Sequence, residues 1–467
     1  MPDLPTFSDL KTRKSTIVIV TLMSVLWLTG TVSFLMQEAV HDKCETQRLL
    51  VNGACQMIVV VLGLWTLRSR TDIAIIAVTV AVTYYSTCIN NGESTLVWLN
   101  GLRRYLPYIF FLPIVRWLWV DPERRKRFIR VFDRNIYIFL WIQFPCLCFQ
   151  AIVWGMGDYG GGSLGWYCSG IISQLIYLIS FYLMVRAWRP ERGYVGNLLD
   201  NWVLVALLFP SFLNETKISF IFLPLYFVML IPFDRNLPRT LLVVIPMLIA
   251  AVGGASWWYL SYVDRKGEVL KADFFANYVM GDNMIDFAFD LMDSDDVDTD
   301  NVWESDYARG IKFALLPTLL ERGEKNNELW GYGVGQFKGG NFTEKTKFAK
   351  RYEWFLRGTQ TEMFDIVVEL GYLGATLLIL YWVVVFRFFK HAGRGNRNKR
   401  MQLWLGGNML LMIMYTVGFD SLPYVIIALT QCFISSRWKE LPAFEKPYIF
   451  FPPRTAQIKK QLVCRPS

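Results

Sequence analysis

Apolar runs of about twenty residues recur along most of the chain, and they constrain its fold more than any other feature. The first extends over residues 16–36. Eleven more follow at 49–67, 72–88, 96–120, 135–156, 167–187, 198–214, 218–233, 240–262, 365–389, 402–417 and 421–436. A helix of about 20 apolar residues crosses the hydrocarbon core of a bilayer. We therefore expect an all-α polytopic membrane protein with about 12 transmembrane helices.

Composition excludes the soluble classes. Hydrophobic residues make up 54% of the 467 residues and charged residues only 19%, whereas soluble domains contain about 25% charged residues. An ordinary cytosolic enzyme, a secreted disulfide-rich module, a collagen-like fibre and a disordered linker are therefore excluded. Most cysteines lie in or beside the apolar runs, where a thiol packs as a small hydrophobe. His41 and His391 are the only histidines, so we expect no His-based metal site.

The positions of Lys and Arg predict the topology. If the N-terminus lies in the cytoplasm, the short external loops contain only Lys43, Arg48 and Lys217, while basic blocks such as 124–127 and 394–400 are cytoplasmic. This asymmetry follows the positive-inside rule, so we expect both termini to be cytoplasmic. The basic blocks are interpreted as topology signals and lipid-facing cations. No basic stripe indicates a nucleic-acid partner.

One external loop, residues 264–364, is far longer than the others and contains 13 Lys/Arg against 19 Asp/Glu. Trp303, Tyr307, Ile311 and Leu315 would share one helical face, with Asn301 as the N-cap and Pro317 kinking or ending the helix. We therefore interpret the loop as a small folded lid of helices. The chain then divides into nine spans (residues 1–262), the loop domain (263–364), three spans (365–436) and a cytoplasmic tail (437–467).

Charged residues at a membrane boundary are candidates for function, because burying a charge in lipid is unfavourable. Three groups would lie on the external side: Arg103 and Arg104 in the fourth run, the turn Asn214-Glu215-Thr216-Lys217, and Arg309 in the long loop. Cations gathered there suit a lipid-linked phosphate or pyrophosphate, and they would stabilise a departing pyrophosphate. The alternatives are snorkelling arginines, a local ion pair at the turn and a solvated helix face.

Glycines alternate in Gly331-Tyr-Gly-Val-Gly335-Gln336. A nucleotide-binding loop is disfavoured because no βαβ unit surrounds the motif. We expect instead a turn that needs positive φ or a close backbone approach. The acidic run 296–300 begins like a calcium loop but lacks the Gly and the Glu such a loop needs, so we interpret it as a solvated loop.

Two carboxylates, Glu362 and Glu369, stand at the start of the tenth run, shortly after Gln360. Either carboxylate suits a general base if its environment tunes it. The alternative is an interface carboxylate or an anion at a helix N-terminus.

Across residues 95–435 these motifs resemble the bacterial O-antigen polymerase and O-antigen ligase superfamily. The turn 214–217 is similar to a lysine variant of the family's cationic external turn. Arg309 precedes the glycine motif, as in the family, and Glu369-Leu-Gly371-Tyr-Leu-Gly374 fits the pattern that opens the next span. Thr359-Gln360-Thr361 occupies the usual position of a histidine.

The resemblance implies a C-type glycosyltransferase-like fold in a bacterial inner membrane, with the long loop in the periplasm. It implies polymerisation of undecaprenyl-pyrophosphate-linked repeat units of O-antigen, capsule or exopolysaccharide, without metal or other cofactor. Lys217 and Arg309 would hold the donor pyrophosphate and Glu362 would act as base. The expected substrate-binding residues are Arg103, Arg104, Asn214, Glu215, Gln360 and Glu369. Besides the lipid-linked oligosaccharide and the bilayer, a chain-length regulator is an expected partner.

Two other functions stay open. An O-antigen ligase would pass the glycan to lipid A core or another acceptor, but the long loop contains no histidine, which favours the polymerase branch. A lipid-linked oligosaccharide flippase or other transporter would place charges at the midplane and show pseudo-symmetry between its halves. The candidate charges here gather at the outer face, and the two halves look unlike.

Overall fold

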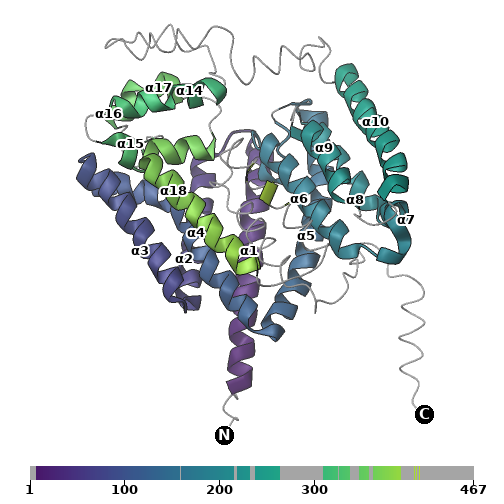
Figure 1. Cartoon of the computed structure of the whole chain (residues 1–467), viewed down its shortest axis with the longest axis horizontal. Helices are drawn as coiled ribbons and strands as arrows, with labels where there is room; N and C mark the ends of the chain where they lie inside the picture. Colours follow the sequence, from purple (N-terminus) through teal and green to yellow (C-terminus); the bar gives the residue numbers. More distant parts are fainter. Residues whose placement is uncertain are drawn as a thin grey trace.

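The computed structural model describes residues 7–157, 159–214, 218–231, 237–262, 309–323, 326–336, 346–356 and 361–390, and positions 404, 406, 407 and 410. Every regular element in these ranges is helical (Figure 1). The expected all-α class is therefore confirmed for the described part of the chain.

The N-terminal elements are α1 (Phe7–Val40), α2 (Glu45–Thr66), α3 (Arg70–Tyr84), the π-helix η1 (Tyr85–Asn90), α4 (Thr95–Val120), α5 (Pro122–Val153), η2 (Gly162–Leu164) and α6 (Ser169–Ala187). They are followed by η3 (Pro190–Arg192), α7 (Gly193–Asp200), α8 (Trp202–Ala206), η4 (Phe209–Phe212), α9 (Ile218–Met229) and α10 (Leu237–Tyr262). The last are α14 (Arg309–Glu321), α15 (Asn327–Trp330), α16 (Lys347–Arg351), α17 (Glu353–Leu356) and α18 (Glu362–Lys390).

Within the described residues, 6 helices are long and apolar enough to cross a membrane, or up to 7 if a bent pair forms one span. The six contain Arg13–Val40, Glu45–Thr66, Arg70–Asn90, Pro122–Val153, Ser169–Ala187 and Glu362–Val384. A helical membrane protein is thus supported, whereas twelve spans are not confirmed. Helix α4 is not among the six, and it carries Arg103, Arg104 and Arg116. The expected runs 402–417 and 421–436 lie almost entirely outside the described residues.

The run at 198–214 is not one straight helix as expected. The segments Gly193–Asp200 and Trp202–Phe212 meet at an angle of 75°. At the break, the Asn201 side-chain amide donates to the Asn197 carbonyl at 2.9 Å. Such a side-chain bond competes with regular helical backbone bonding, and it stabilises the bend.

The main hydrophobic core surrounds α6, whose residues from Ile172 to Met184 are all buried. A buried ion pair crosses this core between α5 and α6, with Arg186 Nη2 2.8 Å from Asp133 Oδ2. The Tyr182 hydroxyl donates to the other oxygen of Asp133. Because unpaired charges inside a bilayer are costly, this pair fixes the two helices to each other.

A second assembly is built on α4 and positions the site. Helix α2 packs along α4, and α3 contacts both α4 and α18. Figure 1 shows α18 running beside α3 and α4, with α14, α16 and α17 at the end of the bundle opposite the N-terminus of α1. Residues far apart in sequence therefore meet at this end.

The described part of the long loop contains the helices α14, α15, α16 and α17, and a second hydrophobic cluster joins it to α18. Leucines of α14, among them Leu315 and Leu319, pack with aromatic residues of α16 and α17 against Phe364 and Val368 of α18. Pro317 was expected to kink or to end this helix; it does not end it, because α14 continues to Glu321 with Pro317 inside it. The expected N-cap Asn301 and the first part of that helix lie outside the described residues.

Candidate functional site

Three carboxylates on one face of α18 surround a single arginine of α4. Glu362, Asp365 and Glu369 are spaced three and four residues apart, so they project to the same side of the helix. The Nη2 atom of Arg104 lies 3.1 Å from Glu362 Oε1 and 2.7 Å from Asp365 Oδ2, and Nη1 lies 3.8 Å from Glu369 Oε2. We call these four side chains the Arg104 cluster.

The Arg104 cluster is almost completely removed from solvent. The Arg104 side chain is 11% exposed, and the three carboxylate side chains are 3% exposed or less. Charge interactions strengthen where water is excluded, but each charge has also lost its hydration. The cluster therefore connects α4 to α18 and places three acidic groups beside one cation.

Glu369 connects this cluster to the glycine motif and to α4. Its Oε2 accepts a hydrogen bond from the Tyr105 hydroxyl at 2.5 Å, and its Oε1 accepts one from the backbone N–H of Gly335 at 3.1 Å. Since both carboxylate oxygens are used in this way, Glu369 has the geometry of a positioning residue rather than of a base.

The glycine motif docks on a break in α18. Gly371 has a φ of 64° inside the helix, and the carbonyls freed there accept loop donors: Tyr332 N–H to Val368 O at 2.8 Å, and Gly333 N–H to Glu369 O at 2.9 Å. Gly331, Gly333 and Gly335 have φ values of 68°, 95° and 88°. The expectation of positive φ and close backbone approach is confirmed.

The π-helix η1 holds the other side of the glycine motif. The Ser86 hydroxyl donates to Trp330 O at 2.6 Å, and Thr87 Oγ1 accepts from Val334 N–H at 2.8 Å. The side-chain amide of Asn91, the residue that follows η1, donates to Gly331 O at 3.0 Å. A single π-helical turn often marks a functional region. Here it turns consecutive polar side chains towards one loop.

Tyr332 secures the motif to the loop helices. Its ring stacks near Phe348 with centroids 4.2 Å apart, and its hydroxyl donates to the Leu319 carbonyl. Burial raises the pKa of the Tyr332 phenol well above its ordinary value, so the phenol stays protonated and keeps donating. The motif is therefore held by α14, α16, α18 and η1 together.

Replacing Gly331 with alanine should destabilise this docking. A Cβ on Gly331 would overlap the backbone carbonyl of Glu369, whereas a Cβ on Gly92, with a matching φ of 69°, would meet no atom within 4 Å. We expect Gly92→Ala to lower the free energy of unfolding by about 1 kcal/mol, the strain of the backbone alone. Gly331→Ala should lower it by about 2–4 kcal/mol, because the clash is added.

Thermal unfolding of the two variants in detergent, compared with wild type, measures this difference. Because Gly92 has nearly the same positive φ but open space around it, Gly92→Ala is the control for a Cβ added at positive φ. Equal shifts for the two variants would contradict the docked arrangement.

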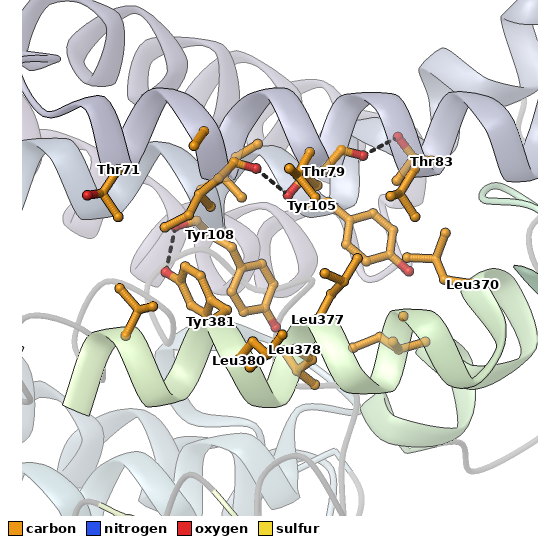
Figure 2. Close-up of a pocket in the computed structure, with 18 residues that line it drawn as sticks. Thr71, Thr79, Thr83, Tyr105, Tyr108, Leu370, Leu377, Leu378, Leu380 and Tyr381 are labelled. Carbon is orange, nitrogen blue, oxygen red and sulfur yellow. Dashed lines mark hydrogen bonds between the residues drawn. The ribbon is translucent and has the colours of Figure 1, made fainter. Parts of the chain in front are cut away.

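An apolar groove continues from the Arg104 cluster between α3, α4 and α18. It has a volume of about 260 Å³ and is lined mainly by aliphatic side chains and three tyrosines (Figure 2). Tyr105 and Leu370 lie at one end, and Thr71 lies at the other. From Thr71 to Thr83 of α3 the groove extends about 18 Å along the helix. Val78 and Leu380 are 45% and 52% exposed, so the groove is open along its side.

Tyr105 belongs to both parts of the site. Its ring lines the groove, and its hydroxyl contacts Glu369 of the charged cluster. The site therefore combines an apolar groove with a buried charged cluster, and the Tyr105 side chain stands between the two. This shape matches a ligand with a hydrocarbon chain and a polar head.

The structure brings together three of the expected site residues, Arg104, Glu362 and Glu369. Arg103 is not part of the cluster, because its side chain lies beside Gly53 of α2. Asn214 is buried and serves the fold: its amide donates to the carbonyls of Gly160 and Ser169, and its oxygen accepts from Ser173. Arg309 is the first residue of α14, although its side chain is outside the described set. Lys217, Glu215 and Gln360 also lie outside the described residues.

Sequence reasoning missed Asp365, Tyr105, Ser86 and Thr87. The spacing of Asp365 from Glu362 and Glu369 predicts a shared helical face, so this residue could have been found. The polar run from Ser86 to Asn91 at the end of an apolar segment was a weaker signal. Among the described residues, no three His, Cys, Asp or Glu side chains are arranged to hold a metal ion.

Comparison with known proteins adds no relative: no family model matches the chain, and no curated protein matches it. The resemblance to the polymerase and ligase superfamily therefore depends on the short motifs and on the topology described above.

Proposed function

We propose that the protein is a membrane-embedded glycosyltransferase that polymerises polysaccharide repeat units carried on undecaprenyl pyrophosphate. The observation that carries the proposal is the junction of the apolar groove with the Arg104 cluster at Tyr105. A polyprenyl chain fits an open, lipid-facing groove, and the pyrophosphate and sugars would then lie next to the buried charges. The resemblance of the glycine motif and of residues 369–374 to the superfamily supports the same function.

In the proposed reaction, a sugar hydroxyl of the acceptor attacks the anomeric carbon of the donor glycan. The bond between that carbon and the pyrophosphate oxygen breaks, and undecaprenyl pyrophosphate leaves with the electron pair. The hydroxyl proton passes to Glu362, which acts as general base. Arg104 lies 3.1 Å from Glu362 and would hold its carboxylate in place, while Lys217 and Arg309 would neutralise the departing pyrophosphate.

A role for Arg104 in binding pyrophosphate is disfavoured by the geometry. Its guanidinium already contacts Glu362, Asp365 and Glu369, and a substrate anion would face those carboxylates. The donor phosphates are therefore better assigned to the cations of the external turn and of α14. This division separates the acidic part of the reaction, on α18, from the cationic part.

The test compares cell-surface glycan by gel electrophoresis in wild type, a deletion strain and three kinds of variant. Lys217→Ala and Arg309→Ala remove the proposed phosphate contacts. Val78→Trp fills the groove, and Val61→Trp is its control, because Val61 is an exposed valine (60%) of α2 that does not line the groove. Membrane levels of each variant are measured in parallel.

We expect the ladder of long chains to collapse to a single repeat unit in the deletion strain and to shorten strongly in Val78→Trp. Val61→Trp should leave the ladder unchanged. Long chains that stay on undecaprenyl and fail to reach their final acceptor would identify a ligase instead. An intact ladder in the deletion strain would overturn the proposal.

A further inference from the structure

Four aromatic side chains form a cluster at the end of α5, apart from the Arg104 cluster. Tyr159 lies at its centre, with its ring centroid 6.1 Å from Trp154, 5.6 Å from Trp166 and 5.4 Å from Tyr167. We call these four residues the aromatic cap. They belong to the connection between α5 and α6, at the C-terminal end of α1, and the expected topology places this connection on the outer side.

The polar edges of both tryptophans in the cap are turned inward. The indole N–H of Trp154 donates to Glu38 Oε2 at 2.7 Å, and the indole N–H of Trp166 donates to Glu38 Oε1 at 3.0 Å. The amide of Gln150 also donates to Glu38, at 3.2 Å. Glu38 of α1 therefore fixes the orientation of both indole rings.

Three buried glutamines fix the backbone of the segment that carries the cap. Gln37 accepts from Trp166 N–H at 2.7 Å, Gln143 accepts from Ser163 N–H at 3.0 Å, and Gln150 accepts from Gly162 N–H at 2.8 Å. All three glutamine side chains are 1% exposed or less. A surface whose backbone is held by buried side chains is rigid before any ligand arrives, which favours tight binding.

The cap presents its tyrosines outward, and the backbone of Tyr167 is strained. Tyr167 has a φ of 62° and is 53% exposed, and Tyr159 is 38% exposed. Of the four non-glycine residues with positive φ in the described ranges, Tyr167 lies in the cap, and His41 and Cys44 lie in the connection between α1 and α2. A bulky residue in this conformation is uncommon, and such strain is retained where the surrounding structure enforces it. The Nζ of Lys43 lies 5.4 Å from the Tyr167 ring centroid.

We propose that the aromatic cap is a carbohydrate-binding platform that receives sugar rings of a glycan chain. The C–H groups on one face of a pyranose pack against the negative face of an aromatic ring, and Tyr159 and Tyr167 offer such rings. Lys43 and His41 at the rim offer hydrogen-bonding groups for hydroxyls. The inference uses the proposed function only to name the glycan, which would be the growing polysaccharide.

A membrane-interface belt is the competing explanation for aromatic residues at this level. In such a belt, tryptophan N–H groups are directed to headgroups and water. In the cap both N–H groups are directed to Glu38, and the ring orientation is enforced by buried glutamines. These two features favour a rigid binding platform over a lipid anchor.

The test measures binding to the full-length protein in nanodiscs. The probe is a set of oligosaccharides of one to four repeat units, released by mild acid from the surface polysaccharide of the cells that produce the protein. We expect wild type to bind the longer oligosaccharides. Tyr159→Ala and Tyr167→Ala should each raise the dissociation constant about tenfold, as the loss of one stacking contact implies.

Two variants serve as controls. Tyr167→Phe should bind like wild type, because stacking needs the ring and not the hydroxyl. Tyr84→Ala removes a tyrosine of α3 that is 41% exposed and lies outside the cap, and it should also bind like wild type. Quenching of tryptophan fluorescence by brominated lipids in the same nanodiscs reports whether the indole rings of the cap lie in the bilayer interface.

Absence of oligosaccharide binding by wild type would overturn the platform, and so would an unchanged dissociation constant in Tyr167→Ala. Quenching of the cap by lipid with unchanged glycan affinity would assign it to the membrane interface. The binding experiment and the ladder experiment can fail independently of each other. A deletion strain with an intact ladder and a cap that binds glycan would retain the platform and reject the polymerase. A collapsed ladder in the deletion strain, together with wild-type glycan affinity in the cap variants, would support the polymerase and reject the platform.

Discussion

Replacing Arg104 with alanine is expected to remove much of the stability of the protein together with the transfer activity proposed for it. The change leaves Glu362, Asp365 and Glu369 close together without the guanidinium that contacts all three. Removing one partner of a buried ion pair costs about 3–5 kcal/mol, because the remaining charge is uncompensated. Thermal unfolding in detergent should show a large drop in midpoint temperature, and the glycan ladder should disappear.

The neighbouring arginine provides a matched control. Arg103→Ala removes the same side chain one residue earlier, where it lies beside Gly53 and outside the cluster, and it should change stability little. Arg104→Lys keeps the charge but loses the forked geometry that reaches several carboxylates, so an intermediate stability is expected. Unfolding of Arg104→Ala at the wild-type temperature would contradict the ion pairs described between α4 and α18.

Glu362→Gln should lower the rate of glycan transfer by about 10²–10⁴-fold, the usual contribution of a general base. The fold should survive, because the glutamine carbonyl can still accept the hydrogen bond that Arg104 donates at 3.1 Å. The rate is measured with purified protein and the lipid-linked repeat unit as both donor and acceptor. Protein stability is followed on the same samples, so that a loss of activity is not confused with unfolding.

Asp365→Asn is the matched comparison for Glu362→Gln. Both residues contact the same Nη2 of Arg104 and are equally buried. If Glu362 is the base, Asp365→Asn should lose less than about tenfold in rate. A large loss in Asp365→Asn with a small loss in Glu362→Gln would transfer the role of base to Asp365.

Much of the helical pattern could be predicted from the sequence, because the length and the apolarity of a segment are enough to identify a candidate span. Residues 16–36, 49–67 and 167–187 correspond to α1, α2 and α6 for this reason. The break at Asn201 could not be predicted in the same way, since it depends on a side-chain hydrogen bond to the Asn197 carbonyl. Composition over 198–214 reads as one continuous span.

The candidate site was predicted in part. Arg104, Glu362 and Glu369 were candidates because charges are rare in apolar segments, but the residues around each of them do not predict that the three side chains are in contact. Their contact joins positions 258 residues apart in the chain. The contacts of Ser86 and Thr87 depend on a π-helical turn, whose altered backbone bonding leaves no periodic signal in the sequence. The glycine motif was interpreted correctly as a turn that needs positive φ or a close backbone approach, yet its partner, the break at Gly371, was visible only in three dimensions.

The long separation between Arg104 and its acidic partners has a consequence for biogenesis. A ribosome adds about 5–20 residues per second, so the carboxylates of α18 emerge about 13–50 seconds after Arg104. During that interval the guanidinium of α4 is without its three carboxylate partners on α18, which have not been made. In the nascent protein, the insertion machinery, lipid headgroups or water must therefore solvate the positive charge of Arg104 for this period. Synthesis of the first turns of α18, about four-fifths of the way along the chain, ends that period.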